Sequence, residues 1–147
     1  MIKDVEDLEV YNRSMKLIKP IYRLAGLLPS NEFRLKDQLT GAAKSVPALI
    51  TEGFAKRRYE KEFKRFLKIA IGSSDEVITH LRMIAIVTPR LSLEAKQLAE
   101  RYKVLSKRIN SLHTHWQSGG TFRLSDTQVN WVIQSHSEID VPVTTDI

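Results

Sequence analysis

The sequence predicts an all-α fold, an antiparallel four-helix bundle with up-down-up-down topology. Two observations support this prediction. Apolar residues recur at steps of three and four along four successive segments, which is the spacing of one helical face. The connections between these segments are short, so consecutive helices should lie side by side and antiparallel. We assign residues 1–117 to the bundle and residues 118–147 to a C-terminal extension.

The first helix is expected over residues 5–28. It carries two adjacent apolar rows. The main row is Leu8, Tyr11, Met15, Ile18, Tyr22 and Ala25, and the second is Val10, Leu17, Ile21, Leu24 and Leu28. Pro20 predicts a kink, because a proline ring crowds the carbonyl four residues earlier, here that of Lys16. The connection that follows offers Ser30 or Asn31 as the N-cap of the next helix.

The second helix is expected over residues 32–54, where small residues are common. Gly41, Ala42, Ala43, Ser45 and Ala48 lie around Pro47, which predicts a bend. Small side chains let helices approach closely, so we interpret this pattern as interhelical packing and not as a ligand site. Gly53 is a candidate C-cap.

The third and fourth helices have the clearest apolar rows. The third, from Tyr59 to Val87, buries Phe63, Phe66, Leu67, Ala70, Ser74, Val77, Leu81 and Ile84. Its Gly72-Ser73-Ser74 segment costs about 1 kcal/mol in helix propensity, which predicts a close contact that compensates. Thr88-Pro89 ends it. The fourth, capped by Ser92, buries Ala95, Leu98, Tyr102, Leu105, Ile109, Leu112 and Trp116.

The charge of the chain is unevenly distributed. The net charge is +6, but residues 1–116 hold 22 Lys and Arg against 13 Asp and Glu, a balance of +9. The last 31 residues hold one Arg against four acidic residues, a balance of −3. A basic body suggests a polyanionic partner, although a basic composition can also serve solubility alone.

The candidate nucleic-acid site is a run of cations at the start of the third helix. It comprises Lys56, Arg57, Arg58, Lys61, Lys64, Arg65 and Lys68. Five of them form a strip about 17 Å long at 1.5 Å per residue, which could follow phosphates along a strand and bind in a salt-sensitive way. No aromatic RNA-binding motif accompanies the strip, so sequence-specific recognition is not indicated. A solvated helix face, softened by Glu60 and Glu62, is the alternative interpretation.

Catalytic and metal-binding patterns are missing from the sequence. His113 and His115 are two residues apart on a helix and point to different faces, and no metalloprotease, phosphate-loop or nucleophile-elbow motif occurs. The chain has no cysteine. We therefore expect no enzymatic activity, no cofactor and no metal. The acidic, polar N-terminus is unlike a signal peptide and no apolar run is long enough to span a membrane, so a cytoplasmic protein is expected.

The C-terminal extension is acidic and holds one apolar cluster around Trp131. A flexible tail and a docking peptide anchored by Trp131 both fit this composition.

Several segments together resemble a known family. DLEVYNRSMKL, LPSNEFRLKDQL, AAKSVPALITEG and KEFKRFLKIAIGSSDEVITHL occur in order between Asp7 and Trp116. They resemble the proteins encoded within intervening sequences of bacterial 23S ribosomal RNA genes. The chain departs from the family pattern at Thr40, Gly41 and Leu49.

The resemblance implies a bundle that assembles into a ring, typically a pentamer, with no known enzymatic activity. It also implies that Glu52, Gly53, Gly72, Ser73 and Glu76 form packing or subunit contacts. The family is similar to accessory proteins of diversity-generating retroelements, which bind a reverse transcriptase and nucleic acid. Our leading hypothesis is a homo-oligomeric RNA-binding module. The alternative is a protein-interaction scaffold, such as an accessory factor to a retroelement reverse transcriptase.

Overall fold

Four helical rods make up the protein in a computed structural model that describes residues 2–117. The first rod consists of two helices, and the other three rods are single helices. The helices are α1 (Glu9–Lys16), α2 (Ile18–Gly26), α3 (Phe33–Ala55), α4 (Glu60–Val87) and α5 (Ser92–His115). Single 3-10 turns, η1 (Val5–Asp7), η2 (Ser30–Glu32) and η3 (Pro89–Leu91), precede α1, α3 and α5. The predicted C-terminal extension, including Trp131, lies outside the described residues.

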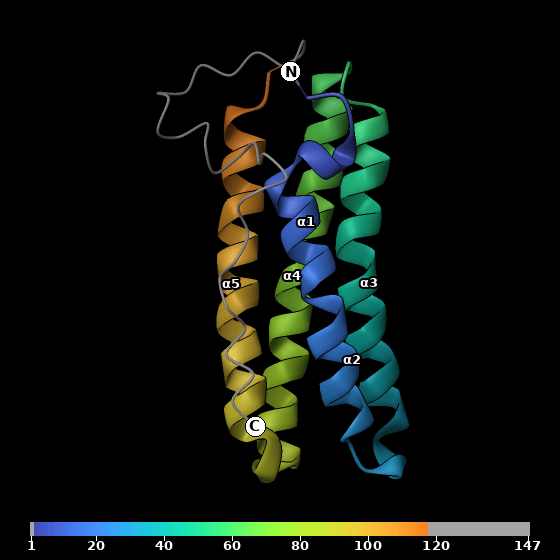
Figure 1. Ribbon diagram of the computed structural model, residues 1–147, viewed down its shortest axis with the longest axis vertical. Coiled ribbons are helices and arrows are strands. Elements are labelled where there is room, and N and C mark those ends of the chain that lie inside the picture. The colour runs from blue at the N-terminus through green and yellow to red at the C-terminus, as the bar shows by residue number, and fades with distance from the viewer. Residues whose placement is uncertain (1, 118–147) are drawn as a thin grey trace.

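The rods form an antiparallel bundle (Figure 1). Helix α4 packs against α3 on one side and α5 on the other, while the α1–α2 rod packs against α3 and α5 and lies across the core from α4. Each rod runs opposite to the rod before it in the chain. This confirms the predicted up-down-up-down topology. No helix in the described part of the chain is long and apolar enough to cross a membrane.

The predicted apolar rows of the last two helices form the core. Every residue named for the α4 row and for the α5 row is buried. The rows at the centre of α3, including Leu39, Val46 and Ile50, are buried with them. Where a helix has a single apolar face, its sequence spacing alone determines which side turns inward.

The first rod differs from its prediction in two ways. The chain is interrupted at Leu17, three residues before Pro20, because the crowded carbonyl is that of Lys16 and the helical hydrogen bonding is disturbed there. Both rows contribute to the core, since Leu8 and Ala25 of the main row are buried with Leu17 and Ile21 of the second row. The main row differs from the prediction at Met15 and Tyr22, which are 47% and 45% exposed. Aliphatic side chains fill the narrow space between α3 and α5, and the longer amphipathic ones remain at its rim.

Gly53 is not the C-cap of its helix. It lies inside α3, which continues to Ala55. A Cβ at this position would lie 2.7 Å from Phe66 Cβ and 3.0 Å from Phe63 Cδ2, both on α4. Gly53 therefore allows α3 and α4 to approach each other, and its role is packing.

The predicted side-chain caps are also absent. The N-cap position of α3 is Glu32 and that of α5 is Leu91, and neither makes a side-chain cap hydrogen bond. Ser30 lies in η2 and Ser92 is already the first residue of α5. The 3-10 turns lead directly into the helices and replace the expected capping residues.

A polar contact joins α4 to α5 at the predicted mid-helix segment of small residues. The buried Ser74 hydroxyl donates to the Tyr102 carbonyl oxygen at 3.3 Å. Ser106 Oγ lies 2.7 Å from Ser74 Oγ and 2.8 Å from Asp75 Oδ1. Ser74 thus makes the close contact that was expected. Gly72 does not, since a Cβ there would meet nothing within 4 Å.

Candidate nucleic-acid interface

The cations at the α3–α4 corner are partly engaged with aromatic rings. The Arg57 guanidinium lies 4.1 Å from the centroid of the Phe54 ring and donates to the Phe54 carbonyl oxygen at 3.1 Å. The Lys56 ammonium lies 4.8 Å from the centroid of the Phe66 ring. Arg58 is exposed. Arg57 therefore helps to close the end of α3, and Lys56 and Arg58 remain accessible.

The cations of the predicted strip along α4 differ in their contacts. Lys61, Lys64 and Lys68 follow one another at steps of three and four and share one face. Arg65 lies on the edge of α4 that faces α3, where it pairs with Glu62 at 3.3 Å. Its guanidinium lies 4.7 Å from the centroid of the Phe66 ring, which Lys56 also contacts. Arg65 and Lys56 thus contact the same aromatic ring, while Lys61, Lys64 and Lys68 line the adjacent face of α4.

Helix α5 adds positive charge to the Lys61–Lys68 side of α4. The pKa of His113 on α5 is lowered, first by its partial burial and then by the positive charges of Lys68 and Lys64. These two lysines therefore lie close enough to α5 to act on one of its side chains.

The same pattern continues along both helices. The pKa of Glu100 on α5 is lowered, first by a hydrogen bond from Lys103 and by its charge, and further by the charges of Arg82 on α4 and Lys107. We call this set of α4 and α5 cations the basic surface. Its members are Lys61, Lys64, Lys68, Arg82, Lys103 and Lys107.

The sequence analysis missed Arg82, Lys103 and Lys107. The sequence does contain a signal for part of this set. On α5, away from the apolar row, lysines recur at steps of seven and four, at Lys96, Lys103 and Lys107. Their proximity to α4 depends on how the two helices align, which the sequence does not state.

Three acidic residues lie among the cations of the basic surface. Glu60 pairs with Lys64 at 3.0 Å, Glu100 pairs with Lys103 at 2.9 Å, and Asp75 contacts Ser106. Exposed pairs between neighbouring turns contribute little to stability, so these lysines can exchange a carboxylate for a phosphate at small cost. Six cations against three carboxylates leave an excess of three positive charges.

The outer surface on the α3 side of α4 has a different character. Glu52, Gly72 and Glu76, three of the residues expected in packing or subunit contacts, are exposed there, and Ser73 is half-buried. On the same helix, Ile69 is 44% exposed and Met83 is 45% exposed. We call the group Glu52, Ile69, Gly72, Glu76 and Met83 the α3–α4 surface. Two large apolar side chains beside a glycine are typical of a surface that another protein chain can cover.

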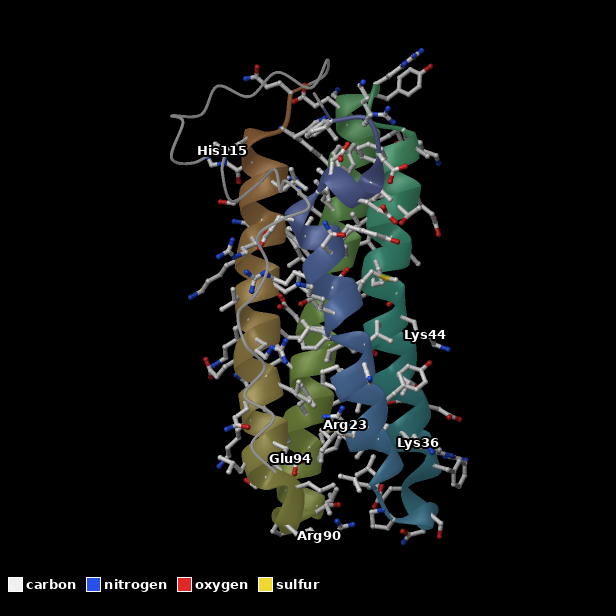
Figure 2. All side chains as sticks on the ribbon, viewed as in Figure 1. Arg23, Lys36, Lys44, Arg90, Glu94 and His115 are labelled. Atoms are coloured by element: carbon white, nitrogen blue, oxygen red, sulfur yellow. The ribbon has the colours of Figure 1, made fainter. Side chains whose placement is uncertain are left out.

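An apolar groove lies between α4 and α5 near the end where α4 stops. Its volume is about 280 Å³. It is lined by Leu81, Arg82, Ala85, Ile86, Ser92, Ala95, Lys96 and Ala99. At this end of the bundle Arg90 Nη2 donates to the Leu27 carbonyl oxygen at 2.6 Å, which ties two interhelical connections together (Figure 2).

Two exposed lysines of α3 lie apart from the basic surface. Lys36 and Lys44 are exposed on α3, on the opposite side of the bundle from α5 (Figure 2). Within residues 2–117, no group of three His, Asp or Glu side chains is placed to hold a metal ion.

The sequence of the chain matches a known family across most of the bundle. A family model described as 23S rRNA-intervening sequence protein covers residues 6–111. No match was found among curated proteins. The matched range includes the α1–α2 rod, α3, α4 and most of α5, and therefore the helices that carry the basic surface. The chain belongs to the family of 23S rRNA-intervening sequence proteins.

Proposed function

We propose that this protein is a non-enzymatic nucleic-acid-binding module and that RNA phosphates contact the basic surface. The observation that carries the proposal is charge shared across two helices. The pKa of Glu100 on α5 is lowered first by Lys103 and further by Arg82 of α4. The pKa of His113 on α5 is lowered first by burial and then by Lys68 and Lys64 of α4. A polyanion that lies across α4 and α5 would neutralise cations from both.

The chemistry of the surface favours binding through phosphates. Contacts from lysine and arginine to phosphates position a nucleic acid but do not distinguish its bases. Binding should therefore depend strongly on salt, because each phosphate contact releases counterions, and should depend little on sequence. Assembly of several copies would place several basic surfaces on one polyanion and raise the overall affinity.

A matched pair of variants tests this role. The test variant carries Lys64→Gln and Lys68→Gln, and the control carries Lys36→Gln and Lys44→Gln, which remove the same charge from α3. Binding of a structured RNA is measured by fluorescence anisotropy over a series of salt concentrations. We expect the test variant to bind more weakly, with a salt slope smaller by about 1 for each lost phosphate contact. Equal losses in both variants would mean that only the net charge matters, and the assigned surface would be wrong.

We further infer that copies of the chain associate through the α3–α4 surface, with the pentameric ring of the family resemblance as the expected form. The surface combines Ile69 and Met83 with Gly72, which leaves room for close approach. The exposed carboxylates of Glu52 and Glu76 belong to the same surface, and Glu76 Oε1 lies 3.3 Å from His80 Nε2. The α3–α4 surface adjoins the basic surface on α4, because Gly72 lies one turn beyond Lys68. Assembly that leaves Lys61 and Lys64 uncovered would keep cations available to a polyanion.

Light scattering at two concentrations tests the association. Ile69→Glu with Met83→Glu places two charges on the α3–α4 surface and should yield a monomer. Met15→Glu serves as the control, because Met15 is 47% exposed on α1 and lies on another rod. An unchanged particle mass in the double variant would exclude this surface, and a monomeric native chain would exclude association altogether.

A protein-interaction scaffold, such as an accessory factor to a retroelement reverse transcriptase, is the second candidate function. The apolar groove between α4 and α5 favours it, because Ile86 is 77% exposed beside the groove and could pack against a partner's apolar side chain. The test uses a purified reverse transcriptase from the same genomic neighbourhood. If it binds the native chain but not an Ile86→Glu variant, the result would support this function over direct RNA binding.

A further inference from the structure

A cluster of arginines surrounds one buried carboxylate where α1 packs against α5. The Glu9 side chain is only 4% exposed. Its Oε1 atom accepts from Arg13 Nε at 2.7 Å and from Arg108 Nη1 at 3.0 Å. Glu9 therefore holds two guanidinium groups, one from each helix, in a fixed position.

A third arginine, on α5, is influenced by the charge of Arg13. Arg101 on α5 is half-buried. Its pKa is lowered, first by burial and then by the positive charge of Arg13. Arg101 makes no side-chain hydrogen bond or ion pair with any residue in the described range 2–117. A partly desolvated cation next to another cation is unfavourable without a counter-charge.

The cluster has more positive than negative charge. Arg13, Arg101 and Arg108 contribute three positive charges and Glu9 contributes one negative charge, which leaves an excess of two. Arg13 is engaged through Nε, and its two terminal nitrogens make no hydrogen bond with a described residue. Planar guanidinium groups that are already oriented match the oxygen geometry of phosphate, and an excess of two charges matches a phosphate dianion.

We propose that the arginine cluster of Arg13, Arg101 and Arg108, with Arg13 and Arg108 oriented by Glu9, is a phosphate-binding site where α1 packs against α5. Glu9 positions Arg13 and Arg108, and Arg101 supplies a guanidinium that the fold itself does not use. The site faces the α1 side of α5, whereas the basic surface lies on the α4 side. It does not depend on the proposed nucleic-acid function. The phosphate can be a free anion or a phosphodiester of a nucleic acid, because both offer the same oxygens.

The probe that tests the site is inorganic phosphate added to the full chain. Calorimetric titration is run in chloride at constant ionic strength, so that general screening does not contribute. We expect saturable binding to the native chain and a loss of about tenfold or more in affinity for Arg101→Gln, since a charge-assisted hydrogen bond is removed. Arg101→Lys keeps the charge but not the planar fork and should recover only part of the affinity.

Two controls show whether the loss of affinity arises at the arginine cluster itself. Lys36→Gln removes an exposed cation from α3, on the opposite side of the bundle from α5, and should leave phosphate binding unchanged. Circular dichroism should show the same helix content for Arg101→Gln as for the native chain, because the Arg101 side chain makes no hydrogen bond or ion pair within the described fold.

The source of the phosphate is determined by two further titrations. A thymidine dinucleotide with a single phosphodiester should compete with inorganic phosphate if the site accepts a nucleic-acid backbone, and should fail to compete if it is reserved for the free anion. Acetate should compete poorly. The proposal is wrong if the native chain does not bind phosphate, if Arg101→Gln binds it equally well, or if acetate competes as effectively as phosphate.

Discussion

Helix α4 meets α3 along one edge and α5 along the other, and the two contacts are built from different chemistry (Figure 1). At the α3 edge, Gly53 faces the Phe63 and Phe66 side chains without room for a methyl group. At the α5 edge, Ser74 and Ser106 join the helices through hydrogen bonds. The first contact depends on shape and the second on polar groups.

The outer surfaces beside the two contacts differ in the same way. Beyond the α3 edge, Ile69 and Met83 are exposed with Gly72 between them. Beyond the α5 edge lie the cations of the basic surface. A single amphipathic helix thus supports an apolar surface on one side and a charged surface on the other. Changes at one edge should leave the function of the other intact, and the following predictions test that separation.

The largest expected effect is that of Gly53→Ala. The added Cβ would overlap Phe66 Cβ, which is attached directly to the α4 backbone, so the helices must move apart. We expect a loss of about 1–3 kcal/mol in the free energy of unfolding, partly offset by the better helix propensity of alanine. For a chain of this size each kcal/mol lowers Tm by about 2–4 °C.

Thermal unfolding followed by circular dichroism measures this loss. Gly41→Ala is the matched control, since Gly41 is also inside α3 but a Cβ there meets nothing within 4 Å. The control should be stabilised by about 0.5–1 kcal/mol. If both variants changed stability by the same amount, the close α3–α4 approach would not be the reason for glycine at position 53.

A smaller loss is expected for Ser74→Ala at the α5 edge. The substitution removes hydrogen bonds to the Tyr102 carbonyl and to Ser106, while Ser106 keeps its contact with Asp75. The expected cost is about 1 kcal/mol, because a net hydrogen bond contributes about that much. Denaturant unfolding of Ser74→Ala, Ser106→Ala and the double variant measures it. Additive losses would contradict a direct contact between the two hydroxyl groups, since coupled residues are non-additive.

The sequence was sufficient for the fold where one face of a helix is apolar. Val77 and Leu81 on α4, and Leu98 and Leu105 on α5, are buried as their spacing predicts. The first rod was ambiguous, because two adjacent rows are both apolar. The packing of the rod between α3 and α5, which depends on the whole bundle, determines that Leu17 and not Met15 turns inward.

The candidate site was predictable only in part, for a similar reason. The lysines at positions 61, 64 and 68 could be grouped because they lie on one helix. Lys103 acts on Glu100 within α5, but Arg82 on α4 acts on the same carboxylate only because the two helices align in a particular register. Arg65 could not be assigned to the α3 side without the position of Phe66.

A modest gain in stability is expected for Gly72→Ala. Gly72 is in the middle of α4, where glycine costs about 1 kcal/mol relative to alanine. A Cβ there would meet no packed neighbour within 4 Å in the described part of the chain. Thermal unfolding at a concentration where the chain is monomeric should show this gain. The same variant should weaken self-association if the α3–α4 surface joins copies of the chain, because the added methyl group prevents close approach. Stabilisation with unchanged association would argue against Gly72 at a subunit contact.

The smallest expected effect is on the titration of His113, and it reports directly on the basic surface. The pKa of this histidine is lowered by burial and by Lys68 and Lys64, so replacing both lysines by Gln should raise it toward the ordinary value of 6.5 without restoring it fully, because the burial remains. The sign also fixes the pH dependence of stability. The folded chain favours the neutral form of a histidine whose pKa is lowered by folding. The free energy of unfolding therefore decreases as the pH falls below about 6.5. This decrease should be smaller in the double variant.

Proton NMR of the His113 ring, identified by its absence in His113→Asn, measures the titration. Lys36→Gln with Lys44→Gln should leave the pKa of His113 unchanged, since neither lysine contributes to its shift. A polyanion bound across α4 and α5 should raise the pKa, because its negative charge offsets Lys64 and Lys68. If a polyanion binds the chain and the pKa of His113 does not change, the polyanion must bind elsewhere. The basic surface would then not be the binding site, and the role of the α3–α4 surface in self-association would be unaffected.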